Sequence, residues 1–149
     1  MSYDSNCDNC PYKNQKHLKS EKKTYRESPP IGLENNNSDT LLVFQATGIK
    51  EWGIGQASAA GRRIELSWER KQKIRNDFNI INVVQCLPGN NGDRDLEPNI
   101  ISIYSCLNRL EHIQKEKNYK RIILFGQIAQ NVGDNLLYKL GIKVDVIIL

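Results

Sequence analysis

The sequence predicts a single α/β domain with three layers, α/β/α, around a four-stranded, mainly parallel sheet. Short apolar runs alternate along the chain with longer segments in which apolar residues recur at helical spacing. This alternation is typical of right-handed crossovers between parallel strands, which place helices on both faces of a sheet. At 149 residues the chain has room for one hydrophobic core.

The first 40 residues are expected to form a cap and a loop rather than core. They are rich in Lys and Asn, and they contain Pro29-Pro30 and the run Asn35-Asn36-Asn37. Such composition is typical of turns and irregular segments. We therefore divide the one domain into a polar N-terminal segment, 1–40, and an α/β region, 41–149.

The α/β region carries the alternating pattern of strands and helices. Strands are predicted at 40–46, 79–85, 121–125 and 144–149. Helices are predicted at 60–76, around Ile100 to Leu110, and at 127–140. In the second helix the predicted packing face consists of four apolar residues, Ile100, Ile103, Leu107 and Leu110. Gly141 is expected to cap the third helix.

The composition indicates in which compartment the protein works and which kinds of partner it could bind. The net charge of +4 and the pI near 8.9 describe a mildly basic chain that could bind an anionic partner. No apolar run approaches the roughly 20 residues that cross a bilayer, so we expect no membrane segment. The N-terminus lacks the apolar stretch of a secretory signal, and we expect a monomer in the reducing cytoplasm.

The chain has four cysteines, and in a reducing compartment these favour metal or redox chemistry over disulfides. Cys7 and Cys10 lie in one turn of chain, Cys86 follows the second predicted strand, and Cys106 lies in the next helix. All four could converge and bind tetrahedral zinc or a [4Fe–4S] cluster, between which spacing does not decide. Alternatively, Cys86 and Cys106 are small buried hydrophobic residues. A thioredoxin-like role is less favoured, because no strand precedes the first pair.

The segment from Ile81 to Asp95 resembles a motif of the uracil-DNA glycosylases that hold a [4Fe–4S] cluster. In that family an Asn on a strand precedes a cluster Cys by four residues, as Asn82 precedes Cys86 here. The opening Cys7-x-x-Cys10-Pro11 is similar to the family's first Cys pair, and Cys106 lies on the helix where the fourth ligand belongs. The resemblance covers nearly the whole chain.

The resemblance implies a role for each matching residue. Cys7, Cys10, Cys86 and Cys106 would hold a structural [4Fe–4S] cluster, with zinc as the less favoured alternative. The substrate would be DNA containing uracil, from which the extruded base is cleaved in the first step of base-excision repair. Asn82 would pair with the base through its amide donor and acceptor; otherwise it is a strand-end Asn that bonds to turn backbone.

The expected pocket lies at the carboxyl ends of the strands, where open α/β sheets bind ligands. By the resemblance, Gln45 and Asn82 would serve catalysis, and Gly48, Asn91 and Arg62 would contact the substrate. A group of basic residues on and after the first helix could contact phosphates or form a solvated face. These are Arg62, Arg63, Arg70, Lys71, Lys73 and Arg75.

The sequence departs from the family's pattern at three places. The family's first motif reads Gly-Glu-Ala-Pro-Gly, but this chain has Gln45 in the place of the Glu, and an amide can orient water without accepting its proton. Gln45 could equally be an inert loop residue. Gln56 occupies the place of a Phe that stacks on the base, for which Phe44 or Trp52 could substitute.

The third departure is the lack of a His-Pro-Ser-type motif, which the family carries after its last strand. Neither His17 nor His112 is a substitute for this motif by its position in the sequence. The departures favour a rival interpretation, an inactive or truncated iron–sulfur module that binds nucleic acid without cleaving it. A further alternative is a small α/β protein that is stabilised by zinc and has no nucleic-acid role.

Overall fold

The computed structural model describes residues 4–19, 24–27, 30–48, 59–89, 96–141 and 145–148. Its centre is a four-stranded sheet in which every pairing is parallel. The strands lie in the order β4 (Asn79–Asn82), β3 (Thr40–Phe44), β5 (Arg121–Leu124) and β6 (Asp145–Ile148). The predicted α/β class is confirmed, and each predicted strand is present.

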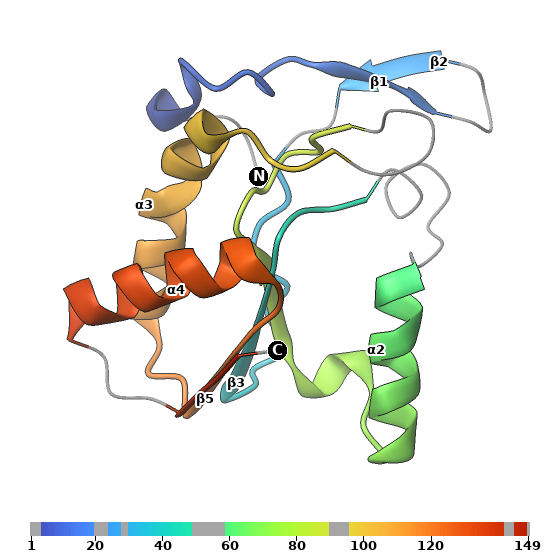
Figure 1. The fold of residues 1–149 in the computed structure, drawn as a ribbon, viewed down its shortest axis with the longest axis vertical. Helices are drawn as coiled ribbons and strands as arrows, with labels where there is room; N and C mark the ends of the chain where they lie inside the picture. The colour runs from blue at the N-terminus through green and yellow to red at the C-terminus, as the bar shows by residue number, and fades with distance from the viewer. Residues whose placement is uncertain are drawn as a thin grey trace.

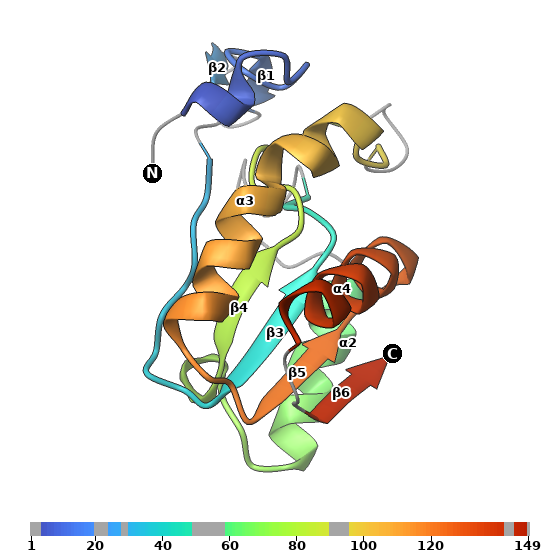
Figure 2. The same cartoon turned by 90° about the vertical axis from the view of Figure 1, so that its left-hand side faces the viewer.

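Helices lie on both sides of this sheet, which makes three layers. Helices α3 (Ile100–Glu116) and α4 (Gln127–Leu140) lie on one face. Helix α2 (Ala59–Arg70) lies on the other, as Figures 1 and 2 show from two directions. Helix α2 contacts the rest of the chain through Trp68, whose ring stacks on that of Phe78 with the ring centroids 5.3 Å apart. No helix in the described ranges is long and apolar enough to cross a membrane.

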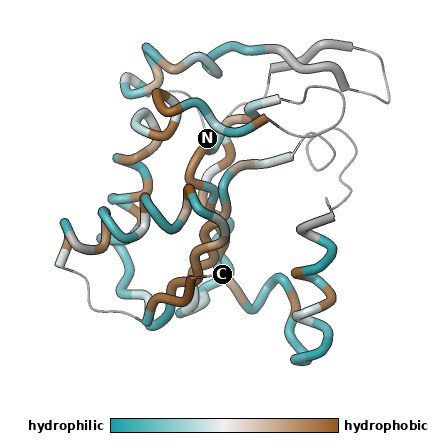
Figure 3. The backbone as a smooth tube through the Cα atoms, in the orientation of Figure 1, coloured by the Kyte–Doolittle hydropathy of each residue, from teal (hydrophilic) through white to brown (hydrophobic). Residues whose placement is uncertain are grey.

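The hydrophobic core lies between the sheet and the pair α3 and α4. Val43 is the register partner of Ile81 on one side and of Leu124 on the other, and such partners in parallel strands point to the same face. All three side chains are buried with apolar residues of α3 and α4. Figure 3 shows the strands as the most hydrophobic part of the chain. Burial of this continuous face is the main stabilising contribution.

Helix α4 begins and ends where it was predicted. Gly141 has a φ of +64°, the left-handed conformation that ends a helix, so the predicted cap is confirmed. Within the helix, Gly133 lies against β5 so closely that an added Cβ would be 2.5 Å from Cδ1 of Leu124. The absence of a side chain at this position therefore allows α4 to approach the sheet.

The predicted packing face of α3 is partly wrong. Ile100 is 64% exposed, whereas Ser102, Ser105 and Cys106 are buried. The hydroxyl of Ser105 donates to the carbonyl of Ile101 at 2.8 Å, and this bond satisfies a polar group that burial would otherwise leave unpaired. Small residues whose polar groups bond within the helix are thus buried in α3 where the prediction had placed Ile100.

The N-terminal segment is also more structured than predicted. It contains a 3-10 helix, η1 (Ser5–Cys7), and an antiparallel pair, β1 (Lys16–Lys19) and β2 (Thr24–Glu27). Tyr12 belongs to the buried core, and its hydroxyl accepts a 2.7 Å hydrogen bond from the backbone of Asn99. The expectation that residues 1–40 form no core is therefore wrong.

A second part of this segment covers the outer edge of the sheet. The backbone N–H of Glu34 donates to the carbonyl of Ile80 in β4 at 2.8 Å, and the N–H of Ile80 donates back at 3.0 Å. The N–H of Ile31 donates to the carbonyl of Gln85 at 2.7 Å. These bonds satisfy part of the strand edge that no other strand covers.

Two predicted boundaries are shifted. The first helix ends at Arg70 rather than at residue 76, because Gln72 adopts a φ of +56° that breaks the helix before the short 3-10 helix η2 (Arg75–Asp77). The strand predicted at 79–85 ends at Asn82, and the following residues turn toward α3. This turn carries Cys86.

Candidate functional site

The carboxyl edge of the sheet brings Gln45, Thr47 and Asn82 together. Phe44, the last residue of β3, is the register partner of Asn82, the last residue of β4. Pairing continues past the strands, because the N–H of Val84 donates to the carbonyl of Gln45 at 3.0 Å. Nδ2 of Asn82 donates a 3.2 Å hydrogen bond to Oγ1 of Thr47. The side chain of Asn82 is therefore bound to the side chain of Thr47, in the segment that follows β3.

A row of half-buried side chains crosses the sheet at this edge. Phe44 and Phe125 stack with their ring centroids 4.5 Å apart and their planes at 6°. Since Phe44 and Asn82 alternate with Val43 and Ile81, they face the side of the sheet on which α2 lies. Phe44 thus lies in register beside Asn82 on this side of the sheet, with its ring stacked on that of Phe125.

The four cysteines are free thiols and come from three separate parts of the chain. Cys7 lies in η1, Cys86 follows β4 and Cys106 lies in α3, with exposures of 2%, 4% and 3%, and Cys10 is half-buried. The pKa of Cys86 is raised to about 12, mainly by burial and in addition by the charges of Cys106, Cys10 and Cys7, while the charge of Arg109 lowers it. The thiol of Cys86 therefore lies near enough to the other three thiols to interact with them electrostatically.

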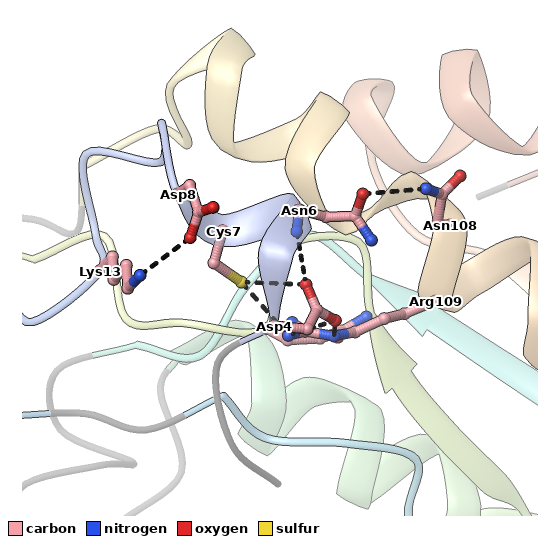
Figure 4. Close-up of polar contacts among 8 residues, drawn as sticks. Asp4, Asn6, Cys7, Asp8, Lys13, Asn108 and Arg109 are labelled. Atoms are coloured by element: carbon pink, nitrogen blue, oxygen red, sulfur yellow. Dashed lines mark hydrogen bonds and ion pairs between the residues drawn. The ribbon is translucent and has the colours of Figure 1, made fainter.

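At Cys106 two groups oppose part of the effect of burial. Burial raises the pKa of Cys106, but a hydrogen bond from the backbone N–H of Gln85 lowers it, as does the charge of Arg109. Nη2 of Arg109 donates to Sγ of Cys7 at 3.2 Å. Figure 4 shows the Arg109 side chain reaching from α3 to Cys7 and Asp4 in the N-terminal segment. Sequence reasoning did not identify Arg109, although its place three residues after Cys106 is on the same helix face.

The donor set fits a tetrathiolate metal or iron–sulfur centre in its chemistry. The side-chain geometry fits it less well. Among the residues that the structure describes, no group of three or more His, Cys, Asp or Glu side chains is arranged to hold a metal ion. The thiols are therefore not gathered around one point in this structure.

Of the other predicted site residues, the structure describes Gly48 and Arg62 but not Asn91. Gly48 is buried just beyond β3. Arg62 is exposed on α2 and its guanidinium pairs with Glu65 at 3.1 Å and Glu69 at 3.9 Å, so it supports the solvated-face interpretation. Asn91 lies outside the described residues, as do Trp52 and Gln56.

The two histidines lie in other elements than Asn82. His112 is exposed on α3, and its Nε2 lies 2.9 Å from Oε1 of Glu116 on the same helix. His17 lies in β1 and pairs in register with Arg26 of β2. That neither histidine replaces the family's His stays a prediction.

No protein-family model matches this chain, and a search of curated proteins finds no match either. The function is therefore inferred from the residues, their resemblance to a motif and their arrangement.

Proposed function

We propose that this protein is a uracil-DNA glycosylase-like enzyme that hydrolyses the N-glycosidic bond of uracil in DNA. The observation that carries the proposal is the amide of Asn82 at the carboxyl edge of the sheet. One of its N–H bonds is used by Thr47, and this bond fixes the orientation of the amide. The second N–H and the Oδ1 oxygen then form a donor and acceptor pair that matches O4 and N3–H of uracil.

The remaining chemistry falls to neighbouring residues. A base must leave the DNA stack before it can meet Asn82, and the half-buried ring of Phe44 offers an apolar surface beside it. Gln45 directly follows β3, where its amide can orient the attacking water by hydrogen bonding. It cannot take the proton from that water, so we expect slow hydrolysis.

We propose that Cys7, Cys10, Cys86 and Cys106 hold a [4Fe–4S] cluster, with zinc as the less favoured alternative. Such a centre would supply a cross-link and not a reacting group. It would join η1 and the turn after β4 to α3, which carry the thiols. Binding at the centre stabilises the folded chain by mass action, because the unfolded chain does not present the preformed site. A monomer in the reducing cytoplasm suits this role, since thiols persist there.

Uracil release from a labelled single-stranded oligonucleotide, by protein purified without oxygen, tests the proposed activity. We expect release by the unaltered chain and a loss of more than about 100-fold in Asn82→Ala, because the amide is the group that distinguishes the base. Asn118→Ala, a change at an exposed Asn after α3, is the matched control and should retain the activity. Equal release by the two variants would contradict the assignment of Asn82.

A second candidate function is a nucleic-acid-binding module that recognises the base through Asn82 without catalysis. Gln45, in the place of a carboxylate that could accept a proton, is the observation that favours it. This module would bind uracil-containing oligonucleotide, lose that binding in Asn82→Ala, and release no base. Measuring binding and release on the same preparation separates the two candidates.

A further inference from the structure

We infer that Arg109 is a positioning residue for the thiolate centre, an inference that rests on the metal-binding part of the proposed function. It supplies a buried positive charge that orients Cys7 and offsets the negative charge of the assembled thiolates. The Arg109 side chain is 10% exposed. A guanidinium shielded from water interacts strongly with a nearby anion, because little solvent screens the two charges.

The contacts of Arg109 connect the parts of the chain that carry the cysteines. Its Nη2 donates to Sγ of Cys7 at 3.2 Å, and its Nη1 donates to Oε1 of Gln85 at 3.4 Å. Gln85 is buried and immediately precedes Cys86, and its backbone N–H is hydrogen-bonded to Cys106. The planar fork of the guanidinium thus reaches both Cys7 and the turn of Cys86 from the helix of Cys106.

The carboxylate of Asp4 beside Cys7 increases the need for a positive charge at this position. Its Oδ1 lies 3.6 Å from Sγ of Cys7, where the thiol donates to it. A thiolate has no proton to donate, so a deprotonated Cys7 would face a carboxylate at short range. Arg109 also pairs with Asp4, with Nη2 lying 3.0 Å from Oδ2. One guanidinium therefore contacts both anions and reduces their mutual repulsion.

A simpler role for Arg109 would be to tether the N-terminal segment to α3 through its ion pair with Asp4. The two roles predict opposite effects of Asp4→Asn, which keeps the side-chain oxygen that caps η1. A tether would be broken, and metal binding would weaken. If Arg109 acts on the thiolates, loss of the nearby carboxylate leaves metal binding unchanged or makes it tighter.

The test is an anaerobic titration of the metal-free, full-length chain with Co(II), followed by sulfur-to-cobalt charge-transfer absorption. This band reports thiolate coordination directly and does not depend on enzymatic activity. We expect Arg109→Met to weaken Co(II) binding by about 10- to 100-fold, as loss of an outer-shell partner does at other metal sites. Arg109→Lys, which keeps the charge, should recover part of that loss. Arg121→Met, the same change at an exposed site, should have no effect.

Several outcomes would overturn the inference. These are equal binding by Arg109→Met and Arg121→Met, a loss in Asp4→Asn as large as that in Arg109→Met, or no sulfur-to-cobalt band in the unaltered chain. Thermal melting of the metal-free variants checks folding, and Arg109→Gln replaces Arg109→Met if the latter does not fold. Uracil release is assayed separately. A chain that releases no uracil but shows the expected Co(II) pattern would contradict the proposed enzymatic function and leave the inference about Arg109 standing.

Discussion

Asn82 and Thr47 join the carboxyl ends of two neighbouring strands through a side-chain hydrogen bond of 3.2 Å from Nδ2 to Oγ1. Thr47→Val removes the acceptor and keeps the branched shape, so the amide of Asn82 loses one restraint on its orientation. We expect uracil release to fall about tenfold, the effect of roughly one hydrogen bond, which is less than in Asn82→Ala. Single-turnover rates on the single-stranded oligonucleotide measure this, and an unchanged rate would show that Thr47 does not orient the amide.

Gln45 gives a prediction of increased activity. Gln45→Glu places a proton acceptor after β3, where the structure has an amide. Because general-base catalysis typically contributes about 100-fold or more, we expect release to rise at least about tenfold and to acquire a dependence on the ionisation of the carboxyl group. The measurement is the rate of release as a function of pH, beside Gln45→Ala. If Glu and Ala variants behave alike, Gln45 does not lie at the reacting centre.

Gly133 gives a prediction about stability. In Gly133→Ala the new Cβ would lie 2.5 Å and 2.8 Å from the two Cδ atoms of Leu124. Leu124 is fully buried, so it cannot move aside without disturbing the core, and we expect a loss of about 1–3 kcal/mol in the free energy of unfolding. Urea denaturation measures it. Asp134→Ala, at an exposed position of the same helix, is the control and should cost far less.

Tyr119 gives a prediction about alkaline pH. Burial raises the pKa of Tyr119, and the 2.9 Å hydrogen bond from Nδ2 of Asn79 opposes part of this shift. The pKa of Tyr119 is higher in the folded chain than in the unfolded chain, where it is about 10. The stabilising contribution of Tyr119 is therefore complete below about pH 10 and is lost as pH rises through the folded pKa. Tyr119→Phe should remove this loss. The difference in the free energy of unfolding between the two proteins should therefore be smaller at about pH 11 than at about pH 8. A difference that does not change with pH would contradict the prediction.

The strands could be predicted from sequence because runs such as Leu41-Leu42-Val43 are apolar on both faces, and few structures except a covered parallel strand bury such a run. The proximity of Cys86 and Cys106 followed from the same logic. A residue after a strand and a residue in the next helix return to the same end of the sheet, as Cys86 and Cys106 do.

Other features left no local signal. Tyr12 is buried through a contact with Asn99, which lies 87 residues away in the chain, and the polar composition around Tyr12 conceals it. Ile100 was placed in the core because an apolar stripe in a helix does not show where its first turn leaves the sheet. Arg109 was overlooked because a lone Arg in an amphipathic helix usually faces solvent, although its spacing from Cys106 was visible.

The backbone bonds between Glu34 and Ile80 have a consequence for how copies of this chain meet one another. An uncovered outer strand offers its amide and carbonyl groups to any extended peptide, including the same strand of another molecule. The stretch around Glu34 occupies part of that position on β4, and it belongs to the same N-terminal segment as Cys7 and Cys10. If the proposed metal centre holds this segment in place, detachment of the segment would separate the thiols and uncover the edge of β4 together, so loss of that centre and self-association are expected to occur together.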